Sequence, residues 1–270
     1  MAPVTSVELD SITRIIDELD PPIRARKLSN RCALEELVYM LQSGVSWRHL
    51  RCRTCSHWTV YKRLQCWVKT GLLYEVWVIV LNHYANKKMT VDPHWFHELF
   101  IDSSMVKNIS GVDCLGKNPT DRGRLATKHS AICDKAGVPV SSVFFKANQH
   151  DCTTTERAVE AISCRVKRDR RYSTVLVADK GYISRGTQAV LMKSRNIRLL
   201  TPHRCNARNH PKMSKPDRCS LHRRHKVENL FCRLDKFKRL HCRVDRFITV
   251  YEAFMQIACT LLTIQELNRG

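Results

Sequence analysis

Apolar residues in the first ninety positions recur every three or four residues, the spacing of one face of an α-helix. Gly44 and Gly71 separate the apolar groups, so we expect several short helices joined by turns. The apolar faces consist of Ile12, Ile15, Ile16 and Leu19, of Leu34, Leu37, Val38 and Leu41, and of Val60, Tyr61, Leu64, Trp67 and Val68.

The pattern changes after residues 86–97, where charged residues and a proline indicate a joint between two modules. Apolar runs with β-branched residues then predict strands, two of which form a hairpin around residues 135–137. Strands and helices alternate afterwards, which predicts a mixed α/β sheet flanked by helices. We therefore expect an all-helical module over residues 1–90 and an α/β domain over 91–270. The expected strands are 98–110, 126–134, 138–147, 174–179 and 197–202, and the expected helices are 153–165, 185–195, 221–240 and 247–267.

The net charge of the chain indicates which kind of partner it binds. The 270 residues include 46 Lys and Arg against 25 Asp and Glu, which gives a net charge of +21. Such an excess favours a polyanionic partner, above all nucleic acid. Short helices in series with Lys62 and Arg63 on the last one before Gly71 suit a helix-turn-helix unit, so these two residues are candidate DNA contacts.

Neither a signal peptide nor a membrane span is expected. The first twenty residues contain acidic side chains and no unbroken apolar core. The longest apolar stretch, residues 72–81, includes Glu75 and is too short to cross a bilayer about 30 Å thick. The 13 cysteines follow no disulfide rhythm, so we interpret them as reduced thiols of an intracellular protein.

Three carboxylates stand out as candidates for chemistry. Asp102 interrupts the apolar strand FIDSS, where a charge is costly unless it binds a metal or is well paired. Asp179 ends the run TVLVAD, and Gly181 lets the chain turn away and leave the carboxylate at the sheet edge. Glu228 lies beside the apolar stripe of the next-to-last helix, with Arg224 one turn earlier on the same side.

Three converging acids in a basic protein suit divalent cations bound near phosphates. Mg²⁺ prefers oxygen ligands and typically takes one or two carboxylates together with substrate phosphates. Two such ions activate an attacking oxygen and stabilise a leaving one. The residues alone leave a second interpretation open, in which each acid simply pairs with an arginine.

These residues also carry a family resemblance. Asp102, then ADKGY around Asp179, then RRHKVENLFCRLDKFKRL around Glu228 resemble the DDE transposases of bacterial insertion sequences, specifically the insertion-sequence-five group. Residues 121–151 resemble that family's glycine-containing loop, Thr-Lys-x-His-type strand and hairpin. The segments ALEELVYMLQSGVSWRHL and TVYKRLQCWVKTGL resemble its N-terminal DNA-binding part. Leu221 stands where the family often has tyrosine, and NPTDRGRL partly replaces its usual serine- and glycine-rich loop.

The resemblance implies a ribonuclease-H-like catalytic domain and a transposase that cuts transposon ends and joins the 3′-hydroxyl to target DNA. It implies two Mg²⁺ or Mn²⁺ ions held by Asp102, Asp179 and Glu228. Arg224 and Lys236 would orient Glu228 or contact end DNA, and Lys180 and Tyr182 would contact the DNA backbone. It further implies double-stranded DNA, both transposon ends and target, as partner and a homo-oligomer on that DNA.

Other interpretations stay open at this stage. The chain could be a domesticated, non-catalytic DNA-binding protein, or a DDE-type nuclease that cuts without joining. Cys52 and Cys55, flanked by histidines, could hold zinc in a protein of another class. We expect a cytoplasmic, nucleoid-associated protein in a bacterial host. In a eukaryotic host it would be nuclear, where the basic run at 167–171 could serve as an address. A second basic segment, residues 203–226, is expected to be a loop.

Overall fold

A computed structural model describes residues 4–21, 28–52, 55–164, 172–202 and 213–269. The basic run at 167–171 and residues 203–212 lie outside the described residues. By contacts the chain forms two compact units. Unit 1 comprises Met1–Leu81, Val106–Cys114 and Arg233–Gly270, and unit 2 comprises Asn82–Met105 and Leu115–Cys232. The functional boundary that we expect near residue 90 stays a prediction.

The predicted N-terminal helices are confirmed. Buried apolar residues line α1, α2 and α3, while Gly44 and Gly71 end α2 and α3 with φ of 73° and 69°. Residues 86–91 belong to helix α4, which ends at Val91, two residues before Pro93. The joint between modules expected at 86–97 stays a prediction. The bounds are α1 Ser6–Leu19, α2 Asn30–Ser43, η1 Trp47–His49, α3 His57–Thr70, α4 Leu72–Val91 and η2 Trp95–His97.

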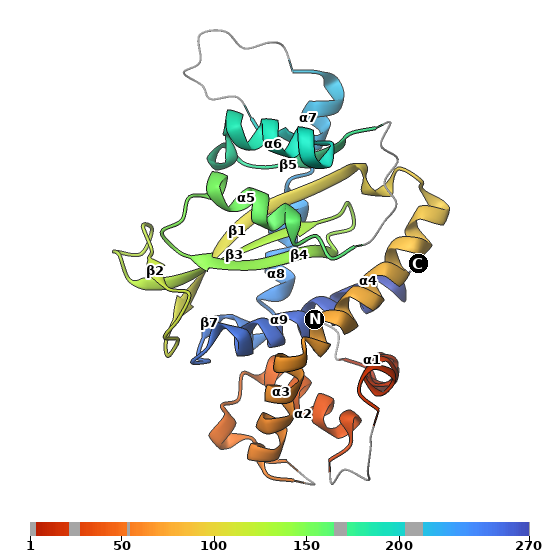
Figure 1. Cartoon of the computed structure of the whole chain (residues 1–270), viewed down its shortest axis with the longest axis vertical. Coiled ribbons are helices and arrows are strands. Elements are labelled where there is room, and N and C mark those ends of the chain that lie inside the picture. The colour runs from red at the N-terminus through yellow and green to blue at the C-terminus, as the bar shows by residue number, and fades with distance from the viewer. Residues whose placement is uncertain (1–3, 22–27, 53–54, 165–171, 203–212, 270) are drawn as a thin grey trace. The chain divides into compact units, whose positions relative to one another are not determined.

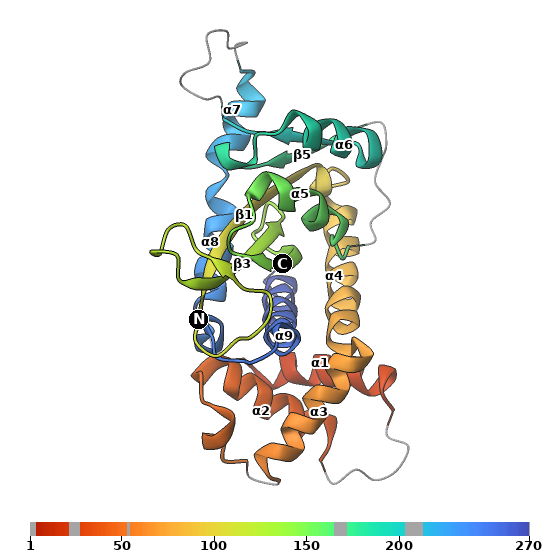
Figure 2. The ribbon, with the colours of Figure 1, turned by 60° about the vertical axis from the view of Figure 1, so that its left-hand side comes forward.

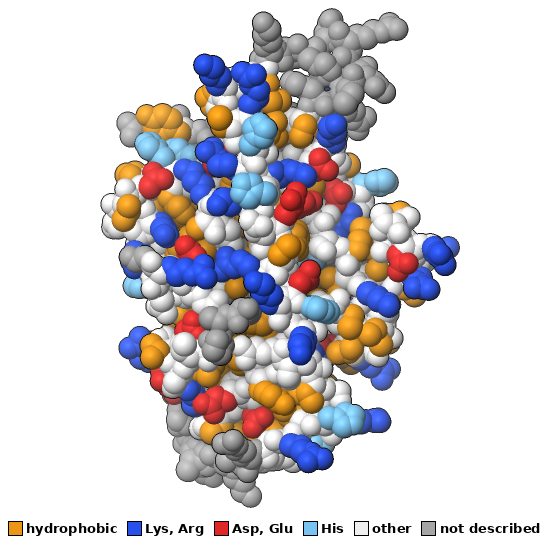
Figure 3. All heavy atoms as spheres, turned by 180° about the vertical axis from the view of Figure 1, so that it is seen from behind, with side chains coloured by type: hydrophobic (Ala, Val, Ile, Leu, Met, Phe, Trp, Pro, Cys, Tyr) orange, Lys and Arg blue, Asp and Glu red, His pale blue; other side chains and the backbone are white. Residues whose placement is uncertain are grey.

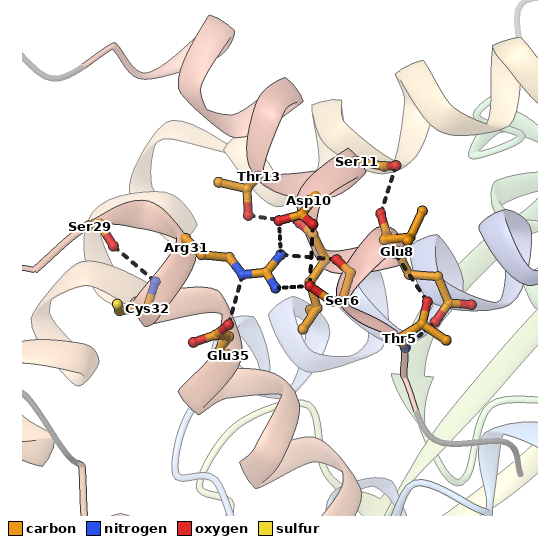
Figure 4. Close-up of polar contacts among 12 residues, drawn as sticks. Thr5, Ser6, Glu8, Asp10, Ser11, Thr13, Ser29, Arg31, Cys32 and Glu35 are labelled. Carbon is orange, nitrogen blue, oxygen red and sulfur yellow. Dashed lines mark hydrogen bonds and ion pairs between the residues drawn. The ribbon is translucent and has the colours of Figure 1, made fainter.

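Arg31 joins α1 to α2 (Figure 4). Its guanidinium lies 2.7 Å from Asp10 Oδ1 and donates to Ser6 Oγ at 3.1 Å, both on α1. On its own helix it pairs with Glu35 at 2.8 Å. Thr5 and Glu8 form a capping box at the start of α1, which satisfies backbone N–H groups that the helix leaves open.

Helix α9 (Ile248–Leu267) forms the centre of unit 1 and contacts α1, α2 and α3. It is long and apolar enough to cross a membrane, but 72% of its apolar window is buried inside the protein, as in a core helix. Helices α3 and α4 are long and apolar enough to cross a membrane only when taken together, and the two are bent by 67° relative to each other. Before α9 come η4 (Lys238–Leu240) and β7 (Cys242–Arg243), and β7 pairs with the end of β1.

A mixed sheet supports unit 2, as predicted (Figure 1). The strand order is β2-β3-β1-β5-β6, with β4 paired to β3. Strands β3 and β4 form the predicted antiparallel hairpin, whereas β1, β5 and β6 run parallel. The bounds are β1 Glu98–Asn108, β2 Gly116–Lys117, β3 Leu125–Cys133, β4 Pro139–Lys146, β5 Thr174–Val177 and β6 Ile197–Leu200.

Helices cover both faces of this sheet (Figures 1 and 2). On one face α5 (Asp151–Glu160) packs on β3 and β4, and α6 (Arg185–Arg195) packs on β6. On the other face α8 (His225–Leu234) crosses the strands, where Phe231 meets the ring of His129 edge-on at 5.5 Å. Helix α5 starts and ends earlier than the predicted helix at 153–165.

Two predictions for the C-terminal part are wrong. Residues 215–222 of the expected loop form helix α7 (Lys215–His222), because Ser214 caps its first turn and Pro216 stands at its start. The single helix expected at 221–240 is broken at Arg223 and Arg224, so that α8 begins at His225 and ends at Leu234.

A buried ion pair in unit 1 gives a stability prediction. Arg239 and Asp245 are each 2% exposed and lie 2.5 Å apart, and Arg239 also donates to the carbonyl of Val45 at 2.9 Å. Arg239→Met leaves a buried carboxylate without its partner, which should lower the free energy of unfolding by about 3–5 kcal/mol. Urea denaturation measures the loss. Arg269→Met, which breaks an exposed pair with Glu266, is the control and should cost less than about 1 kcal/mol. Equal midpoints for the two variants would contradict the prediction.

His129 predicts a pH dependence of stability. Burial lowers the pKa of its imidazole to about 3, and the ring stacks on Phe144. Below pH 6.5 the His129 imidazole is protonated in the unfolded chain but stays neutral in the folded protein. The free energy of unfolding therefore falls as the pH drops from about 6.5 towards 3. The expected slope is about 1.4 kcal/mol per pH unit.

Urea titrations at several pH values measure this slope. His129→Phe should reduce the slope of stability against pH by the contribution of one proton. His222→Gln, at an exposed position of α7, is the control for the loss of an imidazole elsewhere and should keep the slope. An unchanged slope in His129→Phe would show that another group is responsible.

Candidate active site

Asp102 lies where β1 leaves the core. Leu99, Phe100 and Ile101 before it are fully buried, whereas the Asp102 side chain is 25% exposed. Burial raises the pKa of its carboxyl group, and the backbone N–H of Ser103, at 2.8 Å, and the guanidinium of Arg224 oppose that rise. A partly buried carboxylate therefore stands at the edge of the sheet.

Asp179 meets Asp102 because β1 and β5 are parallel neighbours. Their register pairs Leu99 with Leu176 and Phe100 with Val177. Two further residues along both strands bring Asp102 level with Asp179. Side chains at the same level of adjacent strands point to the same face, so the two carboxylates lie side by side. Asp179 then precedes the short helix η3 (Lys180–Tyr182).

One guanidinium gathers all three predicted acids. Arg224 Nη1 lies 4.0 Å from Asp102 Oδ2 and 3.5 Å from Asp179 Oδ1, and Nη2 lies 3.1 Å from Glu228 Oε1. The three carboxylates come from β1, from the end of β5 and from the first turn of α8. The structure thus brings Asp102, Asp179 and Glu228 to one place, with a cationic side chain among them.

The break between α7 and α8 allows the Arg224 side chain to contact the three acids. Arg223 and Arg224 form a turn, in which the N–H of Val227 donates to the carbonyl of Arg224 at 3.1 Å. Arg223 anchors this turn to β1 through a 2.8 Å bond to Glu98 Oε1. In an unbroken helix the two arginines would follow the helix surface, whereas the turn sends one to Glu98 and the other to the acids.

A second polar network lies on the opposite face of the sheet, and the sequence patterns did not single it out. Lys128 on β3 is 4% exposed, and its Nζ donates to Asp151 Oδ1 at 2.8 Å and to the carbonyl of Gln149 at 2.5 Å. The hydroxyl of Ser103, the residue after Asp102, also donates to Asp151 Oδ1, at 2.7 Å. A lysine inside the otherwise buried strand β3 is a sequence signal for such a site, because a buried ammonium group needs an acid partner.

This network also supports the turn after Asp179. A side chain at Gly181 would place its Cβ 3.3 Å from Asp151 Oδ2, so the glycine allows close approach of the η3 backbone to Asp151. Tyr182 is 1% exposed, and burial, followed by the charges of Asp151 and Asp102, raises the pKa of its phenol well above the usual value. Its burial suits packing beneath the acids better than the predicted contact with the DNA backbone.

The remaining predicted DNA contacts are Lys180, Lys236, Lys62 and Arg63. Lys180 and Lys236 are exposed, and Lys62 is exposed with its Nζ 5.8 Å from the ring centre of Trp58. Arg63 is half-buried and bonds to Asn30 Oδ1 and to the carbonyl of Leu28, so it joins α3 to the chain before α2. DNA contact by any of these residues stays a prediction.

The carboxylates provide the hard oxygen donors that Mg²⁺ or Mn²⁺ prefers. Within the described residues no three His, Cys, Asp or Glu side chains already have the spacing of a metal site. Asp179 and Glu228 are each 51% exposed, which leaves their side chains room to reorient around a cation. The donor set therefore fits a divalent metal.

Cys52 and Cys55 do not belong to a group of three or more metal-binding side chains among the described residues. Burial, with further effects of Glu36 and Cys55, raises the pKa of the Cys52 thiol to about 12. Zinc would bind this residue as the thiolate. A zinc site at Cys52 and Cys55 stays a prediction.

Lys and Arg side chains spread over the face drawn in Figure 3, with fewer acids among them, in line with the net charge of +21. The acids of the site are thus a local exception in a basic protein. A negative cluster within a positive surface suits cations and phosphates at one site.

The residues of this site lie within a segment that matches a known protein family. The family described as "Transposase DDE domain" matches residues 98–263, which include all three acids. The family described as "Putative transposase of IS4/5 family" matches residues 10–77, which cover α1 to α3.

Two curated relatives come from Burkholderia cepacia. The putative transposase for insertion sequence element IS402 is 29% identical over 167 residues, which cover 57% of this chain and 71% of the relative. The IS402 uncharacterized 16.2 kDa protein is 28% identical over 120 residues, which cover 41% of this chain and 79% of the relative.

The fold has a counterpart among solved structures. The piggyBac transposase in a synaptic complex with hairpin DNA superposes with a TM-score of 0.50 at 12% identity, covering 98% of this chain and 73% of that one. At this identity the likeness concerns the fold alone, which is the ribonuclease-H-like mixed sheet flanked by helices. With the DDE-domain family matched over most of the chain, the protein belongs to the DDE transposases of the IS4/5 type.

Proposed function

We propose that this transposase cuts transposon ends and joins the freed 3′-hydroxyl to target DNA, with Asp102, Asp179 and Glu228 as ligands of two divalent cations. The observation that carries the proposal is the approach of one guanidinium, that of Arg224, to within 4.0 Å of all three carboxylates. A place that holds one cationic group between three acids is suited to hold metal cations there.

The bound cations would activate the attacking oxygen and stabilise the leaving oxygen. The protein's own residues prepare that chemistry. Asp102 and Asp179 are fixed by the parallel register of β1 and β5, whereas Glu228 is oriented by its bond to Arg224. Arg224 also reduces the repulsion between the acids, and its guanidinium is suited to bind a phosphate of the DNA backbone.

Double-stranded DNA is the proposed partner. The net charge of +21 favours approach to a polyanion, and the helices α1 to α3 are the proposed end-binding module. The piggyBac relative in fold was solved as a synaptic complex with DNA. We propose by analogy that this chain also works as a homo-oligomer, because the joining of two transposon ends needs paired active sites.

Loss of either aspartate tests the assignment. Asp102→Ala or Asp179→Asn should lower metal-dependent cleavage and strand transfer by more than about a hundredfold, beyond the 10- to 100-fold that a supporting residue typically costs. Glu228→Gln should behave alike. Gel analysis of a labelled end substrate with Mg²⁺ or Mn²⁺ measures both steps.

Asp121→Asn is the matched control, because Asp121 is an acid of the same unit with a 42% exposed side chain and pairs only loosely with Arg124, at 3.9 Å. Undiminished joining by either aspartate variant would contradict the assignment. Cut ends that are never joined by the wild-type protein would favour a nuclease instead. DNA binding without any cutting would favour a domesticated DNA-binding protein.

The polar network of Lys128, Asp151 and Ser103 predicts a different effect from that of losing one of the three acids. Lys128→Met leaves Asp151 without its ammonium partner and loosens Ser103 beside Asp102. The Mg²⁺ concentration for half-maximal cleavage should therefore rise by about 10- to 100-fold, with partial recovery at high Mg²⁺.

A titration of cleavage rate against Mg²⁺ concentration distinguishes this effect from a general loss of fold. Lys135→Met, on the β3–β4 turn and paired with Asp92 at 3.6 Å, is the control and should keep the wild-type metal dependence. A Lys128→Met protein with an unchanged metal requirement would show that the network does not position the ligands.

A further inference from the structure

Unit 1 contains a cavity that the proposed chemistry does not use. Its volume is about 420 Å³, and it opens between η1, the first turn of α3 and the start of α9. Aromatic and basic side chains dominate its lining, chiefly Trp47, Arg48, Trp58, Tyr61, Arg246 and Phe247.

The aromatic rings of this cavity form a stacking surface. Tyr61 lies between two tryptophans, edge-on to Trp47 at 5.0 Å and stacked with Trp58 at 5.3 Å with an interplanar angle of 20°. Trp58 is nevertheless 54% exposed, and Phe247 across the cavity is 46% exposed. Large aromatic faces left in water are costly, and they bind flat apolar groups well.

Cations surround these exposed rings. Lys62 Nζ lies 5.8 Å from the ring centre of Trp58, and the Arg246 guanidinium lies 5.6 Å from that of Phe247. Arg48 is exposed at the same opening. The one acid of the lining, Asp245, is buried and neutralised by Arg239. The opening is therefore positive, while the walls are aromatic.

A ligand that matches both features is flat, aromatic and negatively charged, which describes a nucleotide. We propose that this cavity binds one unpaired base of DNA, stacked on Trp58, with the adjoining phosphate near Arg48 and Arg246. A paired base cannot enter, because both of its faces are covered by its neighbours in the duplex, so the base must be extrahelical or single-stranded. The inference rests on the protein's action on DNA, but it requires neither metal ions nor cleavage.

The test compares two fluorescein-labelled DNA duplexes of one sequence, fully paired or with one unpaired base, bound to the full chain in EDTA. Fluorescence anisotropy should show about tenfold tighter binding of the duplex with the unpaired base. Trp58→Leu should reduce this preference to near unity, because it weakens binding of the duplex with the unpaired base more than binding of the paired duplex. Tyr39→Leu is the matched control, because Tyr39 is an aromatic residue of unit 1 with the same 54% exposure, and it should keep the preference.

A second readout covers the case in which Trp58→Leu does not fold. With 2-aminopurine as the unpaired base, the wild-type protein should quench its fluorescence by stacking, and Phe247→Leu should weaken the quenching. No preference for the unpaired base in the wild type, or a preference that survives in Trp58→Leu, would overturn the proposal. Equal loss of affinity for both duplexes in Trp58→Leu would overturn it too. Because EDTA removes divalent metal, none of these outcomes bears on the roles of the three acids.

Discussion

The site depends on the parallel pairing of β1 with β5. This register brings two acids from distant parts of the chain to the same level of adjacent strands, where their negative charges repel each other. A cationic group between the acids lowers this repulsion. In the structure that group is the guanidinium of Arg224, whose distances to Asp102 and Asp179 are 4.0 and 3.5 Å. The geometry of the sheet thus favours positive charge at this site, which is what the proposed binding of metal cations requires.

The turn between α7 and α8 supplies this positive charge. A continuous helix would present its arginines along its own surface, but the turn at Arg223 and Arg224 directs one to Glu98 and the other to the acids. Helix α8 then begins close to the sheet edge and places Glu228 in its first turn, one turn after Arg224. The third acid therefore reaches the site through a local interruption of helical structure.

Sequence patterns predicted the features that depend on burial alone. Periodicity located β1, β3, β4, β5 and α6, because their apolar residues face one core, and the three acids were recognisable as charges at strand ends or beside an apolar stripe. It missed the break in the C-terminal helix, since apolar spacing continues through Leu221 and Val227 on either side of it. It also missed Asp151, because its role depends on contacts with Lys128 and Ser103, which are distant in sequence, and periodicity carries no information about partners.

Alternation along β1 explains why both faces of the sheet matter for one site. Asp102 and Ser103 are adjacent, so their side chains point to opposite faces. Asp102 meets Arg224 on the face covered by α8, whereas Ser103 bonds to Asp151 at the start of α5, where Lys128 is buried. A shift of β1 would break bonds on both faces at once. The acid is therefore positioned by the sheet and by a polar network behind it, and its proposed role as a metal ligand requires such rigidity.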